Sequence, residues 1–84
     1  MSHHDLREHM DGTAMSIAID GRCIATAKRT PRGWTVRSRI GPLWISPPSA
    51  VAPGRPCDIK EVKQKRDARA ELRFVAECAV RESA

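Results

Sequence analysis

Hydrophobic and polar residues alternate from position 15 onward, with the period of two that is typical of a β-strand. In residues 15–20, MSIAID, the methionine and both isoleucines share one face. The pair Asp20-Gly21 follows and favours a two-residue type I′ hairpin turn, because both positions of that turn require positive φ. We therefore expect a β-hairpin in which Ile17 lies opposite Ile24.

Two further strands are predicted to continue this hairpin as a β-meander. The second strand covers residues 22–29, and residues 31–33, Pro-Arg-Gly, are expected to form a three-residue loop with a G1 bulge at the glycine. This loop pairs Thr30 with Trp34. Its length matters because a slip of one residue exchanges the two faces of the third strand.

The meander is therefore expected to have one apolar and one basic face. The apolar face comprises Ile17, Ile19, Ile24, Thr26, Trp34, Val36 and Ile40. The opposite face is flat and composed of small residues with arginines along one strand: Ser16, Ala18, Cys23, Ala25, Ala27, Thr35, Arg37 and Arg39.

Residues 41–57 hold five of the six prolines and predict a connector without regular structure. Proline-rich segments can be docking ligands, but this one lacks a basic anchor beside a clear PxxP, and a rigid link is the favoured interpretation. Trp44 is expected to fold back against the sheet or to form a short fourth strand.

The only predicted helix runs from Asp58 to about Arg81, where Asp58 and Glu61 have capping-box spacing. A stripe at helical spacing faces the isoleucines: Ala68, Leu72, Val75, Ala76 and Ala79. Further apolar residues point elsewhere, so either the connector covers Phe74 or a partner does. The candidate partner or dimer interface comprises Trp44, Ala70, Phe74 and Cys78.

These elements predict an α+β fold, in which a three-stranded antiparallel β-meander, with a possible short fourth strand, packs on one C-terminal α-helix. Residues 15–84 are expected to form a single domain with the proline-rich connector at 41–57. Residues 1–14 are expected to be a disordered N-terminal extension. No apolar run reaches the roughly 20 residues of a membrane span, which predicts a cytoplasmic protein.

The net charge of +5 is concentrated in the meander, since residues 21–40 carry six cations and no acidic residue. Guanidinium groups grip phosphates bidentately, and a strand face can enter the major groove, so this surface predicts binding of double-stranded DNA. The candidate residues are Arg22, Arg29, Arg32, Arg37 and Arg39. The alternative is a solvated face in an arginine-rich proteome, since 11 of the 15 cations are arginine.

Other chemistry has little support in the sequence. Three widely spaced cysteines without a Cys-x-x-Cys pair argue against a disulfide framework, and no nucleophile motif, phosphate loop or metal-ligand spacing is present. We expect no enzymatic activity, no metal and no cofactor. The cations near the helix start, Lys60, Lys63, Lys65 and Arg66, interleave with acids and predict a solvated amphipathic face.

Two resemblances bear on function. The Gly33-Trp34 turn, the alternation of Arg37 with Arg39 and the helical segment ARAELRFVAE resemble the arm-type DNA-binding domain of phage tyrosine integrases and the plant AP2 domain, which implies that the exposed sheet face enters the major groove. Residues 25–44 also resemble small uncharacterised proteins of actinobacterial phages, which implies a phage origin. The alternative is a phage or accessory protein that docks on a host protein, or self-associates, through the apolar helix face.

Overall fold

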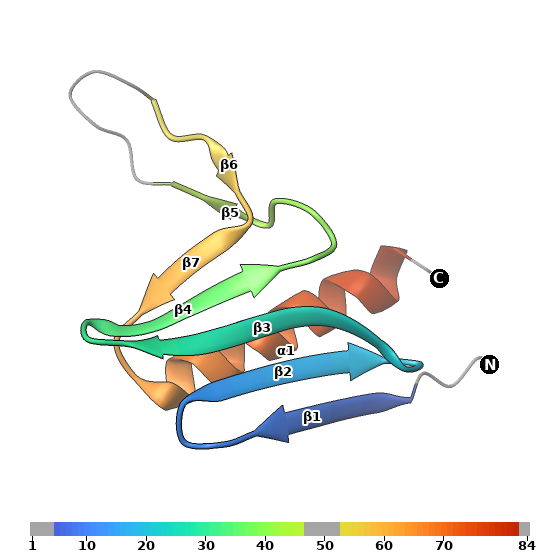
Figure 1. Cartoon of the computed structure of the whole chain (residues 1–84). Helices are drawn as coiled ribbons and strands as arrows, with labels where there is room; N and C mark the ends of the chain where they lie inside the picture. The colour runs from blue at the N-terminus through green and yellow to red at the C-terminus, as the bar shows by residue number, and fades with distance from the viewer. Residues whose placement is uncertain (1–4, 47–52, 83–84) are drawn as a thin grey trace.

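The computed structural model describes residues 5–46 and 53–82, which form an antiparallel sheet packed on one C-terminal helix (Figure 1). The elements are β1 (Leu6–Met10), β2 (Ala14–Ile19), β3 (Arg22–Thr30), β4 (Gly33–Ser38), β5 (Trp44–Ile45), β6 (Pro56–Cys57), β7 (Ile59–Val62) and α1 (Lys65–Glu82). The main sheet has the order β1-β2-β3-β4-β7, and β5 pairs with β6 in a separate ribbon. The predicted α+β class is confirmed, with five strands in the sheet instead of three.

The additional strand β1 lies in the segment that was predicted to be a disordered extension, so that prediction is wrong for residues 6–10. β1 pairs with β2 from Leu6 opposite Ile19 to Met10 opposite Met15. The turn between them is fixed by Asp11, whose carboxylate accepts hydrogen bonds from the backbone N–H of Thr13 at 2.7 Å and of Ala14 at 2.8 Å. Residues 1–4 lie outside the described residues.

The first predicted hairpin forms at Asp20 and Gly21, whose φ values of 52° and 83° are both positive as the turn requires. Its register differs from the expected one, because a β-bulge at Ile17 and Ala18 places Ile17 opposite Ala25 instead of Ile24.

The second hairpin also differs by one residue, because Thr30 pairs with Gly33 and the loop contains only Pro31 and Arg32. Together the two differences shift β4 by two residues relative to β2, which leaves the side to which each of its residues points unchanged. Trp34 and Val36 therefore share the helix-facing side with Met15 and Ile17, as expected. In β3, Ile24 is buried as predicted, but the strand is inverted from Ala25 onward: Ala25 and Ala27 are buried under the helix, while Thr26 lies on the outer side.

The helix begins at Lys65, seven residues later than expected, so the predicted capping box at Asp58 and Glu61 is wrong. Residues 59–62 instead form β7, which pairs with the open edge of β4 and places Val62 opposite Trp34. Pairing with this edge outweighs the local helix signal, as tertiary context commonly does. The helix start uses Gln64, whose carbonyl accepts hydrogen bonds from Asp67 N and Ala68 N at 3.1 Å.

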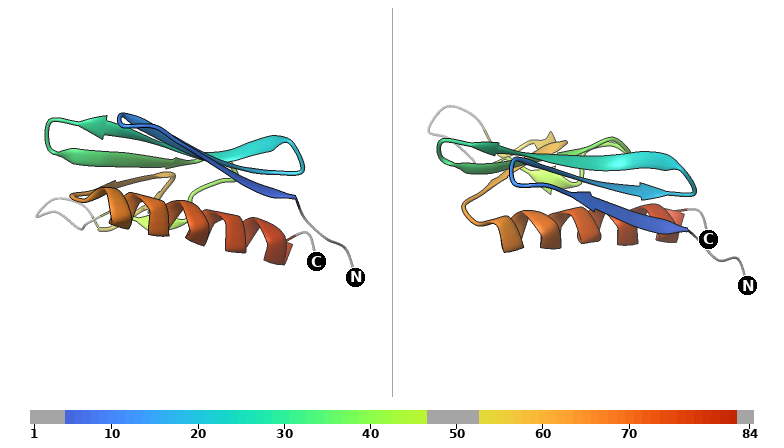
Figure 2. Two further views of the ribbon diagram at one scale, coloured as in Figure 1. Left: turned by 90° about the horizontal axis from the view of Figure 1, so that it is seen from below. Right: turned by 60° about the horizontal axis from the view of Figure 1, so that its bottom comes forward.

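The molecule has two layers, with α1 crossing one face of the sheet (Figure 2). The predicted helical stripe is confirmed, since Ala68, Leu72, Val75 and Ala76 are buried. They pack on a sheet core that comprises Met15, Ile17, Ile24, Ala25, Ala27, Trp34 and Val36. No described helix covers the opposite face, which we call the outer face.

Candidate nucleic-acid interface

The outer face presents small side chains between exposed cations. Cross-strand pairs lie on the same side of a sheet, so the row that joins Ser16, Thr26 and Arg37 runs across it. A second row joins Ala14, Lys28 and Thr35. Arg37, Arg39 and Lys28 are exposed, whereas the small residues between them are half-buried. The face is therefore low in relief, with its long side chains free to extend.

The orientation of β4 is the feature on which the predicted interface depends. Val36 is fully buried beneath the helix, and Ile40 is half-buried against the same core. Arg37 points to the opposite side, and the backbone N–H of Arg39 donates a hydrogen bond to the carbonyl of Ile24 at 2.8 Å, which continues the strand edge. The predicted separation of apolar and basic side chains on β4 is confirmed.

The positive charge of the outer face is not neutralised locally. Within residues 5–46 and 53–82, no ion pair reaches Lys28, Arg37 or Arg39. Glu61 on β7 lies on this face, opposite Thr35, and Arg7 on β1, opposite Ala18, is paired with Asp5 at 3.0 Å. A face with this charge excess attracts anions, and guanidinium groups in particular can bind phosphate oxygens bidentately.

The five arginines proposed from the sequence do not form one surface. Arg37 and Arg39 lie on the outer face, but Arg29 is opposite Trp34 on the helix side, and Arg32 occupies the tip of the β3–β4 hairpin. Arg22 is opposite Ile19 at the other end of the sheet, in a hollow that Ala79 and Glu82 of the helix also line. The bulge in β3 explains part of this division, because it reverses the side to which the later residues of that strand point.

The candidate partner interface is only partly exposed. Trp44 is buried, with 8% of its surface accessible, and its ring centroid lies 6.4 Å from that of Phe74. The connector therefore covers one side of Phe74, which retains 39% exposure. Ala70 is exposed and Cys78 is half-buried. The indole Nε1 of Trp44 is buried without a hydrogen-bond partner in the described structure.

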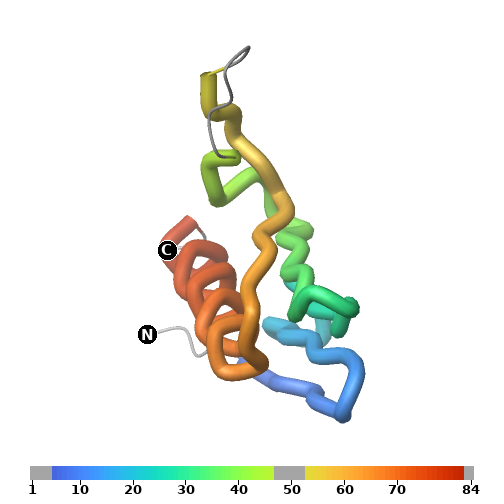
Figure 3. Tube along the Cα trace, turned by 90° about the vertical axis from the view of Figure 1, so that its left-hand side faces the viewer, coloured from blue at the N-terminus to red at the C-terminus, as the bar shows by residue number. Residues whose placement is uncertain are grey.

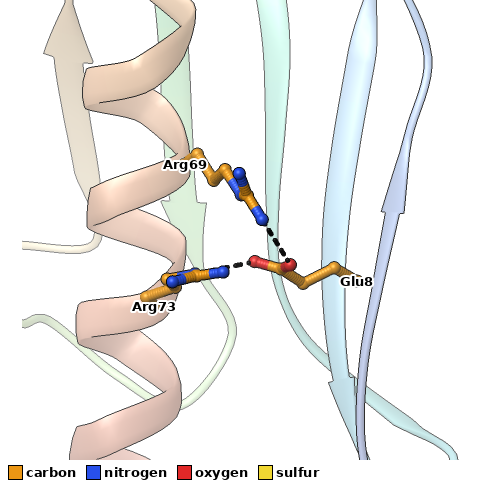
Figure 4. Close-up of polar contacts among 3 residues, drawn as sticks. All are labelled: Glu8, Arg69 and Arg73. Atoms are coloured by element: carbon orange, nitrogen blue, oxygen red, sulfur yellow. Dashed lines mark hydrogen bonds and ion pairs between the residues drawn. The ribbon is translucent and has the colours of Figure 1, made fainter.

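An ion-pair cluster joins β1 to the helix (Figure 4). The sequence did not predict this cluster. The carboxylate of Glu8 accepts hydrogen bonds from Arg73 Nε at 3.1 Å and from Arg69 Nη2 at 3.2 Å. These hydrogen bonds hold the pKa of Glu8 below its ordinary value of 4.5, and the hydrogen bond from Arg73 has the larger effect. The spacing of four residues places both arginines on one helix face, which is the one signal in the sequence. It does not identify Glu8 as their partner, because residues 1–14 are predicted to be disordered.

We expect Glu8→Gln to lower the free energy of unfolding at pH 7 by about 1 kcal/mol or less. The effect is small because both arginines are substantially exposed and solvent screens their attraction to Glu8. The folded pKa is lower than the unfolded one, so the carboxylate stabilises the fold above about pH 4.5 and loses this effect as the pH falls through its lowered pKa. In urea unfolding experiments across pH 2.5–7, the free energies of unfolding of the wild type and the variant should converge at the acidic end of the range. A constant difference, or an equal effect of Glu77→Gln on the same helix, would contradict this assignment.

Other kinds of site receive no support in the described ranges. No group of three or more His, Cys, Asp or Glu side chains there could hold a metal ion. Cys23, Cys57 and Cys78 are free thiols, each half-buried. No described helix is long and apolar enough to cross a membrane.

Comparisons of the chain with protein-family models, with curated proteins and with solved structures found no match.

Proposed function

We propose that this protein is a small DNA-binding module that contacts double-stranded DNA with its outer face. The observation that carries the proposal is the arrangement of β4, which buries Val36 and directs Arg37 outward on a face that no described helix covers, with Arg39 exposed just after the strand. Lys28 on the neighbouring strand adds a third cation without an ion-pair partner among the described residues.

The geometry suits a contact with a phosphate backbone. Arg37 lies in β4 and Arg39 follows one residue after the strand ends, so two exposed guanidinium groups lie close together in the chain at this edge of the face. The intervening surface of Ser16, Ala18 and Thr26 has no long side chain that would hold a duplex away. Two-stranded and larger β-surfaces can enter the major groove, and contacts with phosphates supply most of the sequence-independent affinity.

The proposal predicts a steep dependence of affinity on salt, with a slope of log K against log salt of about −0.9 for each phosphate contact. Arg37→Gln with Arg39→Gln should make this slope shallower by about 1.8 units. The matched control is Arg55→Gln with Arg81→Gln, which removes the same charge from two exposed positions outside the outer face. Fluorescence anisotropy with a labelled duplex between 50 and 200 mM salt measures the salt slope of the wild type and of both double variants.

Equal slopes for these two double variants would show that the outer face is not the contact surface. Wild-type binding that is absent, or unchanged across the salt range, would reject DNA binding altogether.

The proposal includes a phage origin and action in the cytoplasm of the bacterial host, on the basis of the similarity of residues 25–44 to actinobacterial phage proteins.

The second candidate function, docking or self-association through the helix, is favoured by the remaining exposure of Phe74 beside Ala70. It has less support, because Trp44 covers part of the Phe74 ring. Ala70→Glu tests self-association without disturbing that contact: a concentration-dependent mass that falls to the monomer value in the variant would favour it.

A further inference from the structure

The β3–β4 hairpin lies beside the connection between β7 and α1 at one end of the molecule (Figure 3). A second group of cations gathers at this end. Arg29, Arg32, Lys63 and Lys65 line one surface hollow of about 550 Å³ there. We call these four residues the basic pole. Two of them, Lys63 and Lys65, belong to a segment that the sequence predicted to be a solvated helical face.

The fold holds the two halves of the basic pole together firmly. Val62 pairs with Trp34, so the β7–α1 connection leaves the sheet directly beside the hairpin. Gly33 has a φ of 140°, and a Cβ atom at this position would lie 2.9 Å from the Cα of Lys63. The absence of a side chain at Gly33 is therefore what lets the lysine segment approach Arg29 and Arg32 so closely.

The charges at the basic pole are unbalanced. All four side chains are exposed, and no ion pair reaches any of them in the described parts of the chain. One acid, Glu61, lines an adjoining hollow beside Arg32 and Lys63. Lys65 is the first residue of α1, where the helix dipole disfavours a cation. Like charges gathered in this way repel one another unless an anion lies between them.

We propose that the basic pole is a phosphate-binding site, and that it provides a second contact with nucleic acid, separate from the outer face. The identity of the ligand as DNA depends on the proposed function, whereas the affinity for phosphate does not. Lys28 lies on the outer face and Arg29, next to it, on the helix side. A phosphate backbone could therefore pass from the outer face around the hairpin end to the pole.

The phosphate site is tested with inorganic pyrophosphate, followed by backbone amide chemical shifts of the 84-residue protein. Saturable shifts are expected in residues 29–33 and 63–66. Arg32→Gln with Lys63→Gln should weaken this binding at least tenfold, while Arg37→Gln with Arg39→Gln should leave it unchanged. Both pole substitutions are at exposed positions, and Arg29 is retained because it lies against Trp34. Shifts that appear elsewhere, or that persist in the pole variant, would overturn the site.

The nucleic-acid contact is tested with the same variants and a labelled duplex. The pole variant should make the salt slope shallower by about 1.8 units, independently of the outer-face variant. Pyrophosphate binding without any DNA binding would reject the proposed function and the DNA contact, but leave the phosphate site standing. A pole variant with the wild-type slope, alongside an outer-face variant with a reduced one, would reject the pole as a DNA contact and leave the proposed function intact.

Discussion

Leu72→Ala is expected to lower the free energy of unfolding by about 2–5 kcal/mol, measured by urea denaturation at neutral pH. Leu72 has 1% of its surface exposed and is one of the largest fully buried side chains. It lies at the centre of the helix stripe that packs on Ile17 and Val36, so its removal leaves a cavity in the interface between the two layers. A domain of this size is only marginally stable, so we expect the variant to retain little folded protein.

The control for this substitution is Glu77→Ala, which changes an exposed position of the same helix and should cost less than about 0.5 kcal/mol. Alanine is the best helix former, so neither substitution lowers the helix propensity of α1. Comparable losses in the two variants would therefore contradict the assignment of Leu72 to the packed interface between helix and sheet.

Gly33→Ala should be the most damaging glycine substitution in the described sheet, with an expected loss of about 2 kcal/mol or more. A φ of 140° is strained for any residue with a side chain, and the new Cβ would lie 2.3 Å from the carbonyl oxygen of Val62. Both the oxygen and the nearby Cα of Lys63 are backbone atoms, so relief requires β7 to move away from β4.

Gly21→Ala helps to separate the two causes of this effect, because Gly21 also has a positive φ, of 83°, but nothing lies within 4 Å of the added Cβ. It should cost about 1–2 kcal/mol, the ordinary penalty for a left-handed conformation. Thermal unfolding monitored by circular dichroism would rank the two variants. If Gly21→Ala were the more damaging, close approach of β7 at Gly33 would not be the reason for that glycine.

The local sequence pattern was sufficient to predict the two central hairpins and the buried stripe of the helix. Alternation placed Met15 and Ile17 on the buried side, the Asp20-Gly21 pair formed the predicted turn, and Leu72 marked the packed face of α1. The bulge in β3, opposite Ile17, and the two-residue loop after Thr30 could not be predicted, because each moves the register by one residue and together they leave the buried sides of β2 and β4 unchanged.

What escaped sequence analysis depends on contacts between distant segments. β1 is polar and short, and it forms because β2 offers an open edge and because Glu8 meets Arg69 and Arg73 of the helix. β7 has a helix-like start signal, but the free edge of β4 accepts it as a strand. The basic pole arises in the same way, since Lys63 lies more than 30 positions after Arg29 in the chain and only the β4–β7 pairing brings them together.

The most direct test of the account is a map of backbone amide chemical shifts during titration with a short DNA duplex. We expect perturbations along β2, β3 and β4, centred on Thr26, Thr35 and Arg37, and none on the exposed helix surface around Ala70. Perturbations confined to Ala70, Phe74 and Cys78, with the outer face unaffected, would contradict the proposal that this face contacts DNA.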